Sequence, residues 1–79
     1  MNIDLSSLLS IIPAYLDVDG KRYWFHLGMT NTDRHWGAGY HLYNEEPVHF
    51  MAANTPEEAV FRVCGDILKE ASMSFRRTL

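Results

Sequence analysis

The sequence has little of several features that whole classes of protein need. Cys64 is the single cysteine, so no intramolecular disulfide framework holds the fold, and such sparse use is typical of a reducing compartment. No apolar run approaches the roughly 20 residues of a membrane-spanning helix. The start of the chain also lacks the basic region and long apolar run of a signal peptide. We therefore expect a cytoplasmic protein that does not interact with membranes.

Positive charge is also scarce. Seven lysines and arginines stand against ten aspartates and glutamates, which gives a formal net charge of −3. Proteins that bind the phosphate backbone carry clustered positive charge. The composition thus argues against a nucleic-acid partner.

Motifs that carry catalysis are missing as well. The chain contains no G-x-S-x-G, no phosphate-binding glycine loop and no H-E-x-x-H. Cys64 falls on the apolar side of a predicted helix, where burial disfavours the thiolate. His26, His41 and His49 share one face of the predicted sheet, but their spacing matches no established ligand motif. We expect no catalytic residue, no metal and no cofactor, and the protein is predicted not to be an enzyme.

What remains is enough for one small domain over residues 1–79. Hydrophobic residues make up 47% of the chain and charged residues 22%, which is ordinary globular composition. No repeat or low-complexity tract divides it. A domain of this size has a thin core.

Two helices are predicted, one near each end. Asp4 is a suitable N-cap for the first helix, and Pro13 ends it. Its apolar side repeats at i, i+3, i+4 and i+7, through Leu5, Leu8, Leu9 and Ile12. The second begins at a capping box, with Thr55 as N-cap and Glu58 reaching back to it. Its apolar stripe consists of Val60, Val63, Cys64, Ile67, Leu68 and Ala71.

Between the helices, Asp19-Gly20 separates two runs with period two, which is a strong signal for a two-residue hairpin. This turn would place Asp17 opposite Arg22 as a cross-strand ion pair. One face would carry Ala14, Leu16, Val18, Tyr23, Phe25 and Leu27, and the other Tyr15, Asp17, Arg22, Trp24 and His26.

A second hairpin is predicted from residues 39–43 and 48–52, with a three-residue loop. Tyr40, Leu42, Val48, Phe50 and Ala52 would then share one face, and His41, Tyr43, His49 and Met51 the other. The predicted fold class is α+β: a two-layer sandwich of an antiparallel four-stranded sheet with both helices on one face, in the order α-β-β-β-β-α.

The sheet face turned away from the helices is the predicted partner-binding surface. It gathers aromatic, methionine and histidine side chains. Aromatic residues and methionine are enriched in the cores of protein interfaces. Its members are Tyr15, Trp24, His26, His41, Tyr43, His49 and Met51. Two alternatives remain: the strand faces are displaced by one residue, or the loop or C-terminal tail covers these rings.

The polar segment 30–37 is predicted to be a loop and a second part of this contact surface. Arg34, His35 and Trp36 lie in it, and Arg and Trp often dominate binding energy. In the alternative interpretation, Trp36 folds inward and completes the small core.

Two segments resemble a known family. The run from Val48 to Glu70, VHFMAANTPEEAVFRVCGDILKE, resembles the closing strand and helix of HicB-type antitoxin domains, and DGKRYWF (residues 19–25) resembles their earlier hairpin. The resemblance implies an antitoxin or regulator. In overall type, an acidic domain of this size without catalytic motifs is also similar to small phage accessory proteins such as anti-CRISPRs.

The functional hypothesis is a non-enzymatic protein-binding module, in its most specific form a small phage or mobile-element inhibitor of a bacterial defence or toxin protein. Acidic side chains could mimic nucleic-acid charge against a basic groove; the candidates are Asp17, Asp33, Glu45, Glu46, Glu57 and Glu58. The alternative is a HicB-like antitoxin or regulator that forms a homodimer through the aromatic sheet face.

Overall fold

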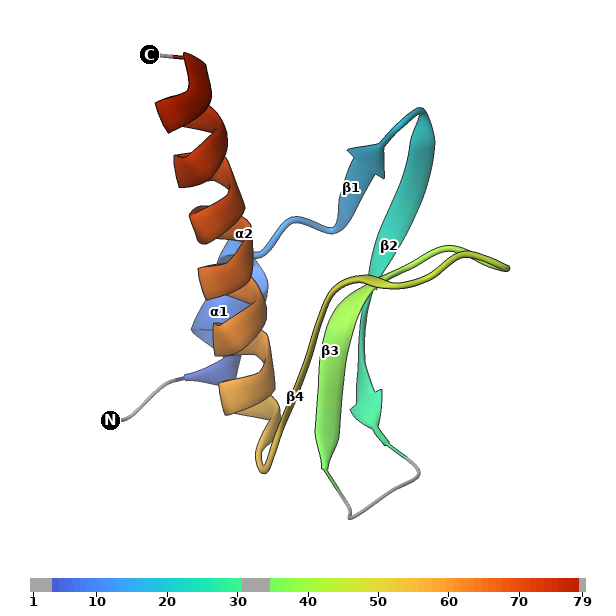
Figure 1. The fold of residues 1–79 in the computed structure, drawn as a ribbon. Coiled ribbons are helices and arrows are strands. Elements are labelled where there is room, and N and C mark those ends of the chain that lie inside the picture. Colours follow the sequence, from blue (N-terminus) through green and yellow to red (C-terminus); the bar gives the residue numbers. More distant parts are fainter. Residues whose placement is uncertain (1–3, 31–34, 79) are drawn as a thin grey trace.

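The computed structural model describes residues 4–30 and 35–78, of which 72–78 are described as helical backbone. The elements are α1 (Leu5–Ile11), β1 (Tyr15–Val18), β2 (Lys21–Met29), β3 (Trp36–His41), β4 (Val48–Ala53) and α2 (Pro56–Thr78). The four strands form one antiparallel sheet in chain order (Figure 1). The predicted α+β class and element order are confirmed.

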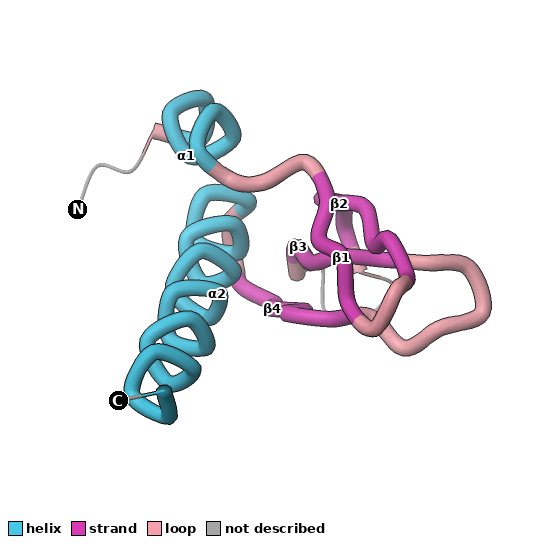
Figure 2. The backbone as a smooth tube through the Cα atoms, turned by 90° about the horizontal axis from the view of Figure 1, so that it is seen from above, coloured by secondary structure: helices cyan, strands magenta, loops and turns pink. Residues whose placement is uncertain are grey.

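The long helix α2 lies along β4 and β3, and α1 packs against α2 (Figures 1 and 2). The core therefore lies between α2 and one face of the sheet. It contains Ile12, Tyr23, Ala38, Tyr40, Ala53, Ala59, Val60 and Val63. Tyr40 is fully buried, and its hydroxyl donates to the Pro13 carbonyl at 2.6 Å. This bond ties the connection between α1 and β1 to the middle of the sheet.

Both predicted helix starts are present. The Asp4 carboxylate accepts from the Ser6 amide, and Thr55 Oγ1 accepts from the Glu58 amide at 3.2 Å. The Glu58 carboxylate, however, does not complete the expected capping box but accepts from Arg62 at 2.7 Å. An i,i+4 ion pair, in which Glu precedes Arg by one turn, takes the place of the reciprocal cap.

The first hairpin has the predicted register. Tyr15 is opposite Trp24 and Asp17 is opposite Arg22. Asp19 and Gly20 both have positive φ, 52° and 80°, as the type I′ turn of a two-residue hairpin requires.

The second hairpin differs from the prediction. Tyr40 pairs with Val48, so the connection is longer than three residues, and β3 begins at Trp36, inside the segment predicted to be a loop. Ala38 pairs with Met51, because a β-bulge inserts an extra residue in β4. His49, at φ 54°, lies in this bulge.

The bulge reverses the predicted faces of β4. Val48 stays on the helix side as predicted, but beyond it Met51 and Ala53 face α2, while Phe50 and Ala52 face away. The predicted placements of His49 and Met51 on the exposed face are therefore wrong, as are those of Phe50 and Ala52 on the helix side. An extra residue changes the side of every later side chain in a strand.

Candidate functional site

The sheet has a face turned away from α2 that no other described element covers. We call it the outer face. It is defined by Tyr15 and Asp17 on β1, Arg22, Trp24 and His26 on β2, His41 on β3 and Phe50 on β4. Five of these seven side chains carry rings, and together they cross all four strands.

One half of the outer face is built on the first hairpin. The Tyr15 and Trp24 rings have centroids 5.4 Å apart, and the Arg22 guanidinium lies 3.8 Å from the Tyr15 ring centroid. Arg22 also donates to both carboxylate oxygens of Asp17, at 2.9 and 3.2 Å. This ion pair lowers the pKa of Asp17 and raises that of Arg22. The hairpin thus presents two tilted aromatic rings beside an ion pair in which the charges of Asp17 and Arg22 balance.

The other half consists of His26, His41 and Phe50. The two imidazole centroids lie 5.4 Å apart with the rings nearly perpendicular, and the His41 and Phe50 centroids lie 6.4 Å apart. Burial lowers the pKa of His41, and the charge that His26 can carry lowers it further. Both effects favour a neutral His41.

Phe50 reaches this face because two glycines make room for it. A Cβ on Gly37 would lie 2.9 Å from Phe50 Cζ, and one on Gly39 would lie 2.9 Å from Phe50 Cα. The ring and backbone of Phe50 therefore fill the space that side chains on β3 would need. The sequence contains a signal for this packing, since glycines two apart in a strand leave a notch on one face.

His49 lies on the opposite side of the sheet. Its Nδ1 is 2.7 Å from Asp66 Oδ2 and its Nε2 is 3.0 Å from Glu70 Oε2, both on α2. Only 12% of the side chain is exposed. His49 thus attaches the bulge of β4 to the helix and has no part in the outer face.

The remaining predicted contact residues do not form one surface. Trp36 is half-buried and packs against the core, as the alternative interpretation proposed. Met51 also packs against the core. Tyr43 is 88% exposed but follows the end of β3, in the connection to β4. His35 lies beside the start of β3, and Arg34 lies outside the described residues.

The acidic candidates are separated as well. Glu45 pairs with Lys21 near the end of the first hairpin, and Glu46 follows it, whereas Glu57 and Glu58 lie at the start of α2, at the other end of β4. Asp17, Glu45 and Glu58 each bind a cation of the chain itself. Asp33 lies outside the described residues. The described acids thus provide no single surface of unpaired negative charge.

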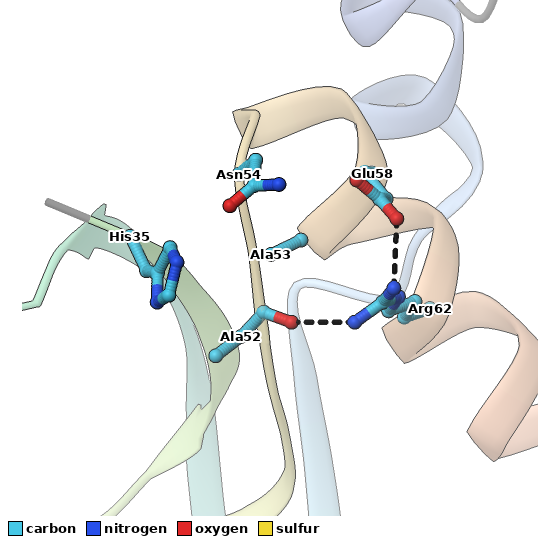
Figure 3. Close-up of a pocket in the computed structure, with 6 residues that line it drawn as sticks. All are labelled: His35, Ala52, Ala53, Asn54, Glu58 and Arg62. Atoms are coloured by element: carbon cyan, nitrogen blue, oxygen red, sulfur yellow. Dashed lines mark hydrogen bonds and ion pairs between the residues drawn. The ribbon is translucent and has the colours of Figure 1, made fainter. Parts of the chain in front are cut away.

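A small pocket opens where β4 meets α2 (Figure 3). It is lined by His35, Ala52, Ala53, Asn54, Glu58 and Arg62. Arg62 donates to the Ala52 carbonyl at 2.8 Å and to the Glu58 carboxylate at 2.7 Å. Through these bonds Arg62 connects the start of α2 to the edge strand β4 and satisfies a backbone carbonyl of that strand.

A second hollow is almost entirely apolar. It lies between the end of α1 and α2 and is lined by Ile11, Ile12, Pro13, Cys64, Ile67 and Leu68. Cys64 is half-buried, and burial raises the pKa of its thiol. The thiolate is therefore disfavoured here, as the sequence predicted.

Two further observations concern what the described part of the chain does not contain. Over residues 4–30 and 35–78, no group of three or more histidine, cysteine, aspartate or glutamate side chains is arranged to hold a metal ion. Among the helices described, neither combines the length and the apolar character needed to cross a membrane.

Comparisons with protein-family models, with curated proteins and with solved structures find no match for this chain. The outer face must therefore be interpreted from its own geometry and chemistry.

Proposed function

We propose that this protein is a non-enzymatic binding module that acts by occupying the surface of another protein with its outer face. The main support is the exposure of three large rings on one side of the sheet. Trp24 is 55% exposed, Phe50 45% and Tyr15 41%. Aromatic side chains are enriched in the buried centres of interfaces and among the residues that dominate binding energy.

The exposure is notable because few large side chains of the described residues are fully buried. The largest of these are Tyr40, Val60 and Val63, and three other core positions are alanines. A chain that places Trp24 and Phe50 outside such a core leaves their apolar area in water, at a cost of roughly 25 cal/mol per Å². A partner that covers the outer face would recover this free energy.

The most specific form of the proposal is a phage or mobile-element inhibitor of a bacterial defence protein, of anti-CRISPR type, that works in the cytoplasm. It is supported by the small size, the net charge of −3 and the absence of catalytic motifs from the sequence. Such an inhibitor needs only a surface that blocks its target. The aromatic outer face supplies apolar contact, and the paired Asp17 and Arg22 give it polar groups at the edge.

The test is quantitative affinity capture from a lysate of the organism that encodes the chain. Wild type is compared with Trp24→Ala, which removes the most exposed of these three rings, and with Leu68→Ala, which removes an exposed apolar side chain on α2. We expect wild type and Leu68→Ala to recover the same protein and Trp24→Ala to recover at least about tenfold less. Equal recovery by all three would show that the outer face is not the contact surface.

A second candidate is self-association through the same face, as in a HicB-like antitoxin or regulator. One observation favours it: the formal charges on the outer face belong to Asp17 and Arg22, which bind each other. Two identical copies of this face can therefore meet without repulsion between like charges.

A further inference from the structure

We infer that a second copy of this chain binds on the outer face while His26 and His41 are neutral, and that it dissociates when these histidines are protonated. The inference rests on the second proposed function. It adds that the partner on the outer face is a second copy of the chain and that the protonation of two histidines controls binding.

The two imidazoles occupy the middle of the outer face. His26 is on β2 and His41 on β3, with Trp24 directly opposite His41 across the strand pair. Phe50 contacts His41 from the β4 side. A protein that covers Trp24 and Phe50 must therefore also cover the imidazoles between them.

Among the residues that the structure describes, no other charged group of the outer face is free to neutralise a proton on these rings. On β1 and β2, Asp17 is bound by Arg22 through two hydrogen bonds. On β3 and β4, the described outer-face neighbours of His41 are Gly39 and Phe50, which carry no charge. Two titratable groups on nearby positions face elsewhere: His49 binds Asp66 and Glu70, and Lys21 binds Glu45.

A second copy is the occupant that this chemistry fits. A neutral imidazole has one donor and one acceptor, so a pair of them can be satisfied by an identical pair related by a two-fold axis. The formal charges on the face are balanced by the pairing of Asp17 with Arg22. The net charge of −3 on each chain opposes association weakly, because charges more than about 8 Å apart are largely screened at physiological salt.

Protonation reverses this fit. An imidazolium has two donors and no acceptor, so two facing imidazolium pairs cannot bond to each other and repel. A two-fold dimer would bring together four such rings in an interface from which water is excluded. The lowered pKa of His41 agrees with this, since burial and the His26 charge already disfavour its protonation in one chain.

The experiment is sedimentation equilibrium of the purified protein at pH 8.0 and pH 5.5, with Trp24→Ala and Leu68→Ala as a matched pair. We expect wild type and Leu68→Ala to dimerise at pH 8.0 and Trp24→Ala to do so at least about tenfold more weakly. Association that needs one neutral imidazole weakens about tenfold for each pH unit below the range in which it takes up a proton. We therefore expect wild type to dimerise at least about tenfold more weakly at pH 5.5.

Histidine proton NMR titrations of wild type at low and at high protein concentration assign the effect to residues. The His41 ring should take up its proton at a lower pH at high concentration than at low concentration. If the dimer constant is the same at both pH values, or if His41 titrates alike at both concentrations, control by the histidine pair is refuted although the face still self-associates. A monomer at both pH values refutes the second copy as occupant, while the capture experiment still decides whether the face binds another protein.

Discussion

The His49 imidazole and the Asp66 carboxylate connect β4 to α2, with Nδ1 2.7 Å from Oδ2. His49 lies in the β-bulge, so this contact is made at the position at which β4 changes faces. Phe50 follows directly and points to the outer face. We therefore expect the contact to stabilise the outer face from the opposite side of the sheet.

Replacing Asp66 with alanine should lower the free energy of unfolding by about 1–2 kcal/mol, because a half-buried imidazole loses a charge-assisted hydrogen bond. Urea denaturation measures the change. Lys69→Ala, an exposed change on the same helix, serves as control and should stay within about 0.5 kcal/mol of wild type. If the two variants are equally stable, the contact between His49 and Asp66 does not hold the bulge.

Gly39→Ala should lower the free energy of unfolding by about 1–3 kcal/mol. The added Cβ would lie 2.9 Å from Phe50 Cα, and backbone atoms cannot move aside as a flexible side chain can. Gly65→Ala is the matched change, since its Cβ meets nothing within 4 Å in the middle of α2. That variant should be more stable than wild type by about 0.5–1 kcal/mol. Opposite signs for the two variants are expected, and a harmless Gly39→Ala would contradict the close packing of β3 and β4.

Tyr40→Phe removes the hydroxyl that donates to the Pro13 carbonyl at 2.6 Å. The expected loss is about 1–2 kcal/mol, because the carbonyl is left without this partner beside a fully buried ring. Tyr43→Phe makes the same chemical change at a side chain that is 88% exposed and should cost nearly nothing. Burial also raises the pKa of Tyr40 to about 12, so absorbance titration should show one late-ionising tyrosine that is missing in Tyr40→Phe.

Acidification should destabilise the monomer through His41. The pKa of His41 is lowered in the fold, first by burial and then by His26. A group with a lowered pKa binds its proton less readily in the folded than in the unfolded state, so stability is lost as the pH falls below the unfolded value of about 6.5. The loss of stability is complete only at pH values below the pKa of His41 in the folded protein. Urea midpoints at pH 7.5 and 5.0, measured at protein concentrations below the range of self-association, should therefore differ less for His41→Phe than for wild type, and an equal difference would argue against the effect.

The sequence predicted the first hairpin well because its determinants are local. Asp19 and Gly20 adopt the positive φ values that their residue types favour, and the turn then fixes every pair, including Asp17 with Arg22. The N-caps Asp4 and Thr55 were predictable for the same reason. Five of the seven outer-face residues, those on β1 and β2, follow from this hairpin alone.

The second hairpin could not be predicted in the same way. Its bulge depends on His49 reaching Asp66 and Glu70, which are 17 and 21 positions further along the chain. Alternation of polar and apolar residues carries no signal for an inserted residue. The alternation in β4 therefore predicts Phe50 in the core and Met51 on the exposed face. Trp36 was ambiguous because a tryptophan after a polar segment suits either a contact loop or a core strand.

The most direct test of the outer face is site-specific photo-cross-linking in living cells of the organism that encodes the chain. The photoreactive residue p-benzoylphenylalanine replaces Trp24 in one variant and Leu68, an exposed apolar residue of α2, in the other. If the outer face binds protein, Trp24→p-benzoylphenylalanine should give a discrete adduct, to another protein or to a second copy, that the Leu68 variant lacks. No discrete adduct at position 24, or the same adducts at both positions, would contradict the account.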